Sequence, residues 1–468
     1  MPVNPAPATP AASSASAATR GAGRVRWRIA FLVCAAITFS YLDRLTLPWT
    51  LSEIQKEYPF SAQTKALFDS AFLISYGLMY VGGGQLLDRW GTRRGFLAVM
   101  LFWSFACASQ GLAGNYGMPA VFGMAFALAM LVASRFLLGA GEGGGFPAAT
   151  RVVTEWFPVN ERATAMGLIN AGTAIGAVAA PWLILVVLNH TGWFGVAPWR
   201  WVFLITGALG LIWSIWWARD YEVPEKHAHV GDAERALILE GHAASSSQNS
   251  SGSSGSIPIA RLLAHRETWA VIGAKFLTDA AWYFYMFWLP KFLQETFDLK
   301  FSAASSVGWI PYAASGVGCL VGGGLSSWLL RRGASVNRAR KIALGLSAAF
   351  MPWVMFVPGL HSLAAVIFIF SLAFFGQQSW STLVMILPTD LIPRRAVGTV
   401  AGFVGLGGAL GGIVLGQIAG WLRDHGFSYT PILVTAGSLH VVAFVLICVV
   451  IPRIRALDFS PPAPNFSA

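Results

Sequence analysis

The chain has 468 residues, of which 55% are hydrophobic and only 11% charged, and its mean hydropathy is +0.59. Soluble proteins carry about 25% charged residues, so this composition excludes a soluble globular protein and indicates an integral membrane protein. No segment shows the alternation over roughly ten residues that is typical of membrane β-barrels, and a helical, multi-pass protein is therefore expected. The net charge of +11 does not indicate nucleic-acid binding, because the basic residues sort by membrane side.

The N-terminal stretch MPVNPAPATPAASSASAAT is rich in Pro, Ala and Ser, which predicts disorder. It is not expected to be a signal peptide, because the apolar run after RVRWR is too long and charges interrupt it. Twelve apolar stretches of about 20 residues then predict twelve transmembrane helices. They cover residues 28–50, 65–87, 95–113, 120–144, 162–188, 199–218, 268–292, 303–329, 341–358, 362–387, 397–420 and 430–452.

Most Lys and Arg residues fall in the loops on one side of these spans, as in RVRWR and in the loop 331–341. Few fall on the other side, where Lys56 and Lys300 are examples. Basic loops stay in the cytoplasm, so this bias predicts that both termini are cytoplasmic. Away from the span ends, three basic residues lie inside spans, and they are Arg44, Arg135 and Lys275.

The hydrophilic segment 219–266 separates the first six spans from the last six, and it contains ASSSQNSSGSSGS. That composition predicts a flexible linker, in which DAERALILE is expected to form a short amphipathic surface helix. The predicted organisation is a disordered tail (1–27), a six-helix half (28–218), a cytoplasmic linker (219–266), a second six-helix half (267–452) and a cytoplasmic tail (453–468).

The two halves resemble each other in sequence. VGGGQLLDRWGTRRG (81–95) corresponds to VGGGLSSWLLRRGAS (321–335), and each stretch follows the second span of its half. GLINAGTAIG (167–176) corresponds to GFVGLGGALG (402–411), and a proline precedes each stretch by the same interval. The sequence therefore predicts two pseudo-symmetric halves, an arrangement typical of transporters in which one half rocks against the other.

The four cysteines, Cys34, Cys107, Cys319 and Cys448, lie in apolar stretches without the spacing of metal ligands. They are expected to be small buried residues. Neither a metal ion nor a cofactor is predicted.

The stretch RFLLGAGEGG places Arg135 and Glu142 seven residues apart in one predicted span, on nearly the same helix face and about 10.5 Å apart along the axis. The first span adds Asp43 and Arg44, which point in different directions. An ionised group near the bilayer centre costs roughly 2.5–3.5 kcal/mol, so these four groups are expected either to face a shared aqueous cavity or to form structural ion pairs.

If the four groups face a shared cavity, the chemistry of arginine and of carboxylates assigns them different roles. An arginine remains charged and its planar fork matches a carboxylate, so Arg44 and Arg135 are predicted to bind an anionic substrate. A carboxylate that is partly removed from water takes up a proton more readily, so Asp43 and Glu142 are predicted to carry the coupled proton.

Further polar groups in the spans suit a hydroxylated ligand, since amides and hydroxyls bind hydroxyl groups and an aromatic ring covers the apolar face of a sugar. Hydrogen bonds between helices are the alternative role for each of them. These candidates are Tyr41, Tyr76, Asn170, Gln377, Gln378 and Trp380.

The seventh span carries Lys275 and Asp279 at the spacing of one helical turn. They either form an internal salt bridge, or Lys275 meets the substrate from the C-terminal half. Tyr283 follows as another substrate-binding candidate. Pro290 is expected to bend the outer end of the span, and His440 in the last span is expected to be a packing residue.

The loop after the second span carries Asp88, Arg89 and Arg93. One alternative is ordinary anchoring by positive charge on the cytoplasmic side. The other is a gate, in which Asp88 accepts hydrogen bonds from a helix N-terminus of the opposite half.

Several of these motifs resemble a known family. GGGQLLDRWGTRRG is similar to the cytoplasmic loop motif of the major facilitator superfamily. YLDR and RFLLGAGEGGGFPAATRVVTEWFPVNERATAMG resemble the anion:cation symporter family. WLPKFL, GVGCLVGG, LLRRGASVNRARK and VGTVAGFVGLGGALGG are most similar to bacterial hexuronate transporters. The resemblance covers nearly the whole chain apart from the N-terminal tail and the linker.

The resemblance implies an all-α fold of twelve transmembrane helices, the gate role of Asp88 and the division of roles between arginines and carboxylates. It implies proton-coupled symport of an organic anion, with a hexuronate such as galacturonate or glucuronate expected. An aldonate, an aldarate or another carboxylate is the alternative, because Ala409 stands where several relatives with other acid substrates carry Asn. The expected setting is the bacterial inner membrane, with the protein acting as a monomer in the lipid bilayer.

Two other classes of protein fit the sequence less well. A membrane-embedded enzyme would need a cluster of catalytic side chains at a membrane face, and the short loops carry none. A channel or receptor would not explain the repeated halves and the charges inside the spans.

Overall fold

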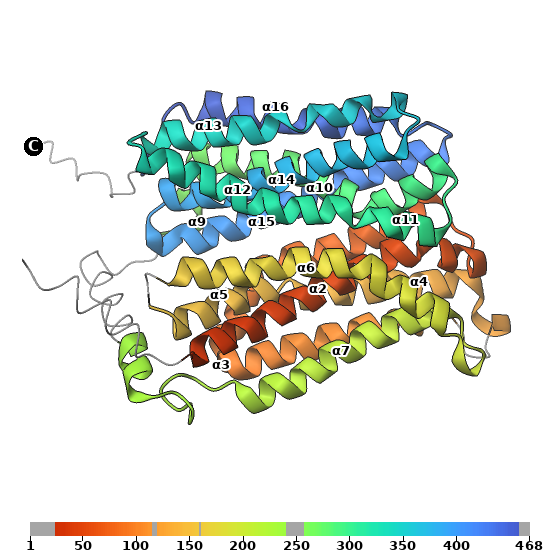
Figure 1. Ribbon diagram of the computed structural model, residues 1–468, viewed down its shortest axis with the longest axis horizontal. Coiled ribbons are helices and arrows are strands. Elements are labelled where there is room, and N and C mark those ends of the chain that lie inside the picture. Colours follow the sequence, from red (N-terminus) through yellow and green to blue (C-terminus); the bar gives the residue numbers. More distant parts are fainter. Residues whose placement is uncertain (1–23, 115–118, 159–160, 240–256, 458–468) are drawn as a thin grey trace, which may run out of the picture.

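The computed structural model describes residues 24–114, 119–158, 161–239 and 257–457 (Figure 1). Regular structure in these residues is helical. The N-terminal half consists of α2 (Val25–Glu57), α3 (Ala62–Gly111), α4 (Pro119–Glu142), α5 (Gly145–Trp156), α6 (Arg162–His190), η1 (Trp193–Gly195) and α7 (Pro198–Asp220). The C-terminal half consists of α9 (Ile259–Leu263), α10 (Arg266–Phe297), α11 (Phe301–Gly308), α12 (Ile310–Arg331), α13 (Val336–Ala349), η2 (Pro352–Gly359), α14 (Leu363–Leu391), α15 (Arg394–Asp424) and α16 (Thr430–Val450).

The described helices make twelve passes through the molecule, which confirms the predicted fold class. The long α3 contains two of them, because Gly91 adopts φ 71° and ψ 163° and folds the second arm back. The fourth pass is longer than its predicted range of 120–144, since α5 carries it on to Trp156 after a break at 143–144. Ten segments in the described part are long and apolar enough to cross a membrane, and α10 and the second arm of α3 complete the set.

The two halves lie side by side, with the red-to-yellow N-terminal half and the green-to-blue C-terminal half as two layers in Figure 1. The start of α2, the segment after α7 and the C-terminal segment lie at one end of the molecule, which we call the linker end. The opposite end, where α2 connects to α3 and α15 connects to α16, is the far end.

Glycine packing repeats in the two halves. A Cβ on Gly176 of α6 would lie 2.2 Å from the carbonyl oxygen of Thr38 on α2. In the C-terminal half a Cβ on the matching Gly411 of α15 would lie 1.9 Å from the carbonyl oxygen of Phe276 on α10. Only glycine permits such a close approach of two helices. The halves therefore use the same contact between corresponding helices, as the sequence repeat predicts.

The first part of the segment between the halves is packed onto the N-terminal half. Residues 232–239 form the short helix that the sequence predicts, but its Glu234 is fully buried. Glu234 accepts hydrogen bonds from the backbone N–H groups of Val25 and Arg26 at 3.3 and 3.1 Å, and from Nη1 of Arg26 at 3.0 Å. Nε of Arg26 also binds Glu161 at 2.8 Å. The stretch ASSSQNSSGSSGS and both chain termini lie outside the described residues.

All four cysteines are free, and Cys34 and Cys107 are buried.

Candidate functional site

Arg44 and Glu142 form an ion pair inside the N-terminal half. Nε and Nη2 of Arg44 on α2 donate to Oε2 of Glu142 on α4 at 3.0 and 2.8 Å. Oγ of Ser40 donates to the same oxygen at 3.0 Å, whereas Oε1 is buried and has no hydrogen bond with any described residue. The two helices thus join charges that are 98 residues apart in the chain.

Arg135 lies on the same helix as Glu142 and is fully buried. Its three guanidinium nitrogens make no hydrogen bond with any residue that the structure describes. Instead, Cζ lies 4.6 Å from the ring centroid of Phe72 on α3 and 5.9 Å from that of Phe287 on α10. Because Phe287 belongs to the C-terminal half, this cation lies where the two halves meet. A buried, unpaired guanidinium is strongly unfavourable unless an anion joins it.

Glycines hold α4 close to α3. A Cβ on Gly139 would lie 2.2 Å from the carbonyl oxygen of Phe72, and one on Gly143 would lie 2.8 Å from that of Tyr76. These glycines share one helix face with Arg135 and Glu142. The helix face that carries Arg135 and Glu142 is therefore also the surface on which α4 packs, and this packing fixes where its two charges point.

Asp43 points away from the other three charges. Neither of its carboxylate oxygens makes a hydrogen bond within the described residues, although Cys107 and Thr206 lie beside it. The expectation of one aqueous cavity shared by all four charged groups is wrong for this structure. Asp43 faces the second arm of α3 and α7, and each of the four residues is at most 2% exposed.

Tyrosines surround the ion pair. The ring centroids of Tyr41 and Tyr76 lie 4.6 and 4.7 Å from Cζ of Arg44. Tyr283 comes from α10 of the opposite half and stacks on Phe287 at 5.8 Å. The structure thus brings three predicted tyrosines toward the same region, with rings and phenol groups beside the two arginines.

The C-terminal half contains a separate polar cluster. Nζ of Lys275 lies 2.9 Å from Oδ1 of Asp279, so the salt bridge expected as one alternative is present. Lys275 also donates to Oγ of Ser381 at 2.8 Å. Nε2 of Gln377 donates to Asp279 at 3.5 Å, and its Oε1 contacts Nε2 of His440. His440 is buried as expected, but it belongs to this polar network.

Three other predicted residues lie outside these contacts. Trp380 is fully buried in the core of the C-terminal half, where its ring packs against His440 at 5.6 Å. Asn170 and Gln378 are partly exposed, and their side chains make no hydrogen bond with any described residue.

The sequence analysis missed a buried pair on α3. Lys65 and Asp69 form a salt bridge and are only 1% and 3% exposed. Nζ of Lys65 also lies 4.0 Å from the ring centroid of Trp288 and 5.9 Å from that of Phe287. The spacing of a lysine and an aspartate one turn apart in an apolar run was the signal that could have found this pair.

The gate motif lies at the linker end. Arg89 is exposed, and Arg93 binds Glu222 and donates to the carbonyl oxygen of Ala218 at 2.8 Å. Asp88 lies in α3, but its side chain is outside the described residues. The structure therefore places Arg93 against the segment after α7.

The halves carry matching carboxylates at this end. Glu155, at the end of α5, accepts from Thr92 and from Nε of Arg151 at 3.0 Å. In the other half Asp390, near the end of α14, accepts from Nε of Arg340 at 2.8 Å. Glu155 thus joins α5 to the second arm of α3, and Asp390 joins α14 to α13.

These features define a class of protein. Two similar six-helix halves meet around a buried cation that has no hydrogen-bond partner in the described residues, with an ion pair beside it, and helix ends at the linker end carry charged contacts. This is the architecture of a membrane transporter that works by movement of one half against the other.

The comparison with known families gives the same result. Residues 32–416 match the family model described as Major Facilitator Superfamily, and the chain belongs to this family of transporters, which are not enzymes. It is a multi-pass membrane protein.

Several curated relatives align over almost their whole length. The chain is 27% identical to the hexuronate transporter of Escherichia coli (strain K12), over 94% of this chain and 97% of the relative. It is 28% identical to the D-galactonate transporter of Escherichia coli O6:H1, over 88% of this chain and 92% of the relative.

Solved structures share the fold. The inward-open xylose transporter XylE from E. coli aligns with a TM-score of 0.69 at 13% identity, covering 94% of this chain and 98% of that one. A bacterial homolog of the lysosomal transporter Spinster aligns with a TM-score of 0.65 at 18% identity, covering 92% and 96%.

Proposed function

We propose that this protein is a proton-coupled symporter of an organic anion, with a hexuronate such as galacturonate or glucuronate as its substrate. The observation that carries this proposal is the guanidinium of Arg135, which is buried between the halves without a hydrogen bond in the described residues. A substrate carboxylate would supply the missing anion through a bidentate contact. The relatives named above, a hexuronate and a galactonate transporter, support a sugar acid.

The ion pair between Arg44 and Glu142 supplies a coupling mechanism. In the structure Glu142 neutralises Arg44, with Oε2 of the carboxylate 2.8 Å from Nη2 of the guanidinium. An anion that engages Arg44 as well as Arg135 would draw Arg44 away, and the buried Glu142 would then be stabilised by taking up a proton. Proton and anion would bind with a reciprocal coupling free energy, which is the thermodynamic requirement for symport.

The remaining polar groups would recognise the sugar. Tyr41, Tyr76 and Tyr283 offer hydroxyls and ring faces near the arginines. On the opposite side, Lys275 and Gln377 are oriented by Asp279 and could meet hydroxyl groups. The separate carboxylate of Asp43 is the rival proton carrier.

An aldarate is the second candidate, and one observation favours it. Nζ of Lys65 and Cζ of Arg135 both lie 5.9 Å from the ring centroid of Phe287, so the two cations are within about 12 Å of each other. Two cations at this separation suit a ligand with a carboxylate at each end. Lys65 would have to release Asp69 for this contact.

Orientation follows from charge. The excess of Lys and Arg in the loops at the linker end supports cytoplasmic termini in the bacterial inner membrane, and the linker end would then be the cytoplasmic end. The protein would act as a monomer, because each chain contains both halves of the site.

The test is uptake by purified protein in lipid vesicles. Labelled galacturonate or glucuronate should accumulate above its external concentration only under an inward proton gradient, and an unlabelled hexuronate should compete more strongly than galactarate. Accumulation that persists when a protonophore dissipates the gradient would contradict proton coupling. Stronger competition by galactarate would instead favour the aldarate alternative.

A further inference from the structure

The helices α3 and α15 belong to different halves and run antiparallel along each other. At the far end a Cβ on Gly420 of α15 would lie 2.9 Å from the carbonyl oxygen of Ala62, at the start of α3. Toward the linker end Gly402 still lies beside Val81, with a Cβ distance of 3.7 Å. The two helices therefore form a main contact between the halves, and α3 begins where α15 ends.

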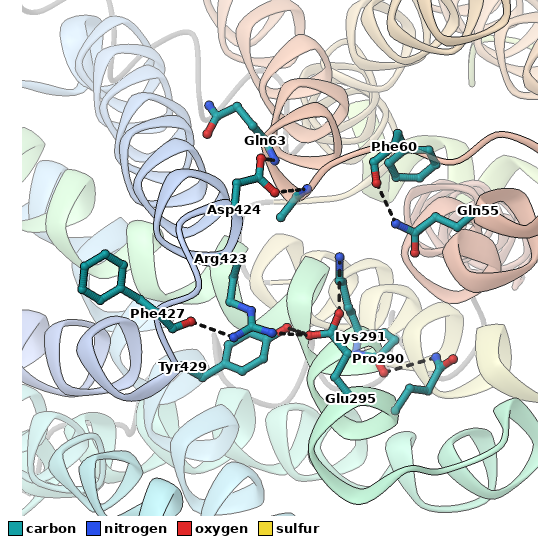
Figure 2. A network of polar contacts seen from close by, with 12 residues as sticks. Gln55, Phe60, Gln63, Pro290, Lys291, Glu295, Arg423, Asp424, Phe427 and Tyr429 are labelled. Atoms are coloured by element: carbon teal, nitrogen blue, oxygen red, sulfur yellow. Dashed lines mark hydrogen bonds and ion pairs between the residues drawn. The ribbon is translucent and has the colours of Figure 1, made fainter. Parts of the chain in front are cut away.

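The last residue of α15 completes the N-terminus of α3. Oδ1 of Asp424 accepts from the backbone N–H of Ala62 at 2.7 Å, and Oδ2 accepts from that of Gln63 at 2.8 Å (Figure 2). Oγ of Ser61 accepts from the N–H of Thr64 at 3.1 Å, and its carbonyl oxygen accepts from Lys65. A helix begins with four N–H groups that have no partner within the helix. In α3 the opposite half satisfies two of them.

Further contacts between the halves lie near the two hydrogen bonds of Asp424. Nε2 of Gln417 on α15 donates to Oγ of Ser70 on α3 at 2.7 Å, and the side chains of Gln63 and Gln417 contact each other. Trp49 of α2 also packs against α11, where a Cβ on Gly308 would lie only 2.3 Å from its ring. The far end is thus closed by hydrogen bonds and packing between the halves.

The residue next to Asp424 is anchored within the C-terminal half. The adjacent Arg423 donates to Glu295 at 3.1 Å and to the carbonyl oxygen of Phe427 at 2.7 Å (Figure 2). The hydroxyl of Tyr429 donates to the same oxygen of Glu295 at 2.7 Å. These contacts join α15, α10 and the start of α16, so Asp424 must move together with the C-terminal half.

We infer that Asp424 is a latch that holds the far end closed, and that it must release the N-terminus of α3 each time this end opens. The inference rests on the proposed function only in that a transporter opens its two ends in turn. A carboxylate at a helix N-terminus gains from both hydrogen bonds and the helix dipole, and separation of the halves removes both. The latch therefore favours the far-end-closed state. The same helix pair carries the predicted gate residue Asp88 near its other end.

A distance measurement tests the latch without any substrate. Spin labels would be placed at Phe194→Cys, which is 92% exposed in the N-terminal half, and at His361→Cys, which is exposed in the C-terminal half, with the native cysteines replaced by serine. Both positions lie at the far end. In lipid nanodiscs, Asp424→Ala should raise the ratio of long to short distances by roughly twofold to thirtyfold, the range that corresponds to the loss of a helix cap.

A second variant removes one hydrogen bond and keeps the carboxylate. Ala62→Pro deletes the N–H that donates to Oδ1, and proline is well tolerated at the first position of a helix, after the extended residue Ser61. It should shift the distances in the same direction as Asp424→Ala. Glu53→Ala is the matched control, because within the described residues Glu53 pairs with Lys56 on its own helix and with no residue of the other half.

Distance distributions of Asp424→Ala and Ala62→Pro that equal that of Glu53→Ala would overturn the latch. Because the labels report opening in the absence of ligand, this result is independent of which anion the protein carries. A failure of hexuronate uptake with the predicted distance shift would leave the latch intact and reject only the proposed substrate.

Discussion

Arg44 donates two hydrogen bonds to a single oxygen of Glu142, and the second oxygen of that carboxylate has no hydrogen bond within the described residues. Arg135, on the helix that carries Glu142, has no hydrogen-bond partner among the described residues. The two arginines therefore differ. Arg44 pairs with a carboxylate of the protein, and under the proposed function Arg135 would pair with the carboxylate of the anion.

Replacement of Arg135 by lysine should weaken binding of the substrate although the charge remains. An ammonium group cannot reproduce the planar fork of a guanidinium, and the loss of one charge-assisted hydrogen bond corresponds to a roughly tenfold or larger loss of affinity. Ligand-induced thermal shift of the purified variant across a concentration series would measure this. Arg28→Lys, an exposed pair with Asp220, is the control. Equal affinity of Arg135→Lys and the wild type would reject the assignment.

The variant Glu142→Gln should uncouple proton and anion. Glutamine mimics the protonated acid, so the variant should still bind the anion and exchange internal for external substrate, but it should not accumulate substrate under a pH gradient. Counterflow and gradient-driven uptake in the same vesicles separate the two activities.

Asp43→Asn should be measured beside it, since Asp43 has no hydrogen bond to lose within the described residues. Normal accumulation by Glu142→Gln together with failure of Asp43→Asn would transfer the coupling role to Asp43.

Gly139→Ala should destabilise the protein. Its new Cβ would lie 2.2 Å from the carbonyl oxygen of Phe72, so α4 and α3 would have to separate, at a cost of about 1–3 kcal/mol. The melting temperature in detergent should fall. Gly324→Ala in α12 is the control, because nothing lies within 4 Å of its Cβ position, and alanine there should be neutral or slightly stabilising.

The two parts of the linker should respond differently to change. Deletion of about half of residues 243–256 should leave transport near normal, because a flexible chain of the remaining length still spans the gap. Glu234→Gln should lower the melting temperature, with a loss of up to about 3 kcal/mol, because the buried Arg26 loses its ion pair with a fully buried carboxylate. A stable Glu234→Gln variant would show that the docked helix contributes little.

The sequence predicted the fold because hydrocarbon constrains it. Each apolar run that crosses a membrane must satisfy its own backbone, so hydropathy locates most of the passes. Their ends were less predictable. The fourth pass continues to Trp156 beyond the predicted end at 144, since the polar groups of α5, such as Glu155, bind neighbours at the linker end instead of entering a loop.

The sequence predicted which residues form the candidate site, but it did not predict which of them pair with each other. The apolar surroundings make Arg44, Arg135 and Glu142 stand out in the sequence, because an ionised group inside a membrane span costs free energy. Which arginine binds Glu142 depends on how α2 and α4 pack, and no local pattern encodes a contact between residues 98 positions apart. The burial of Glu234 was not predicted for the same reason: its partners Val25 and Arg26 are distant in the chain, and the amphipathic pattern of its short helix predicts a surface segment.

Because Glu234 is bound to the start of α2, the helix at residues 232–239 belongs structurally to the N-terminal half. If the chain were cut for co-expression as two fragments, or joined to a half from another family member, a break directly after α7 would take from the first half the carboxylate that caps α2 and neutralises Arg26. A break after Leu239 keeps that carboxylate with the helix it serves. The first half, as a unit that can be exchanged or expressed separately, therefore ends with the docked helix and not with its sixth pass.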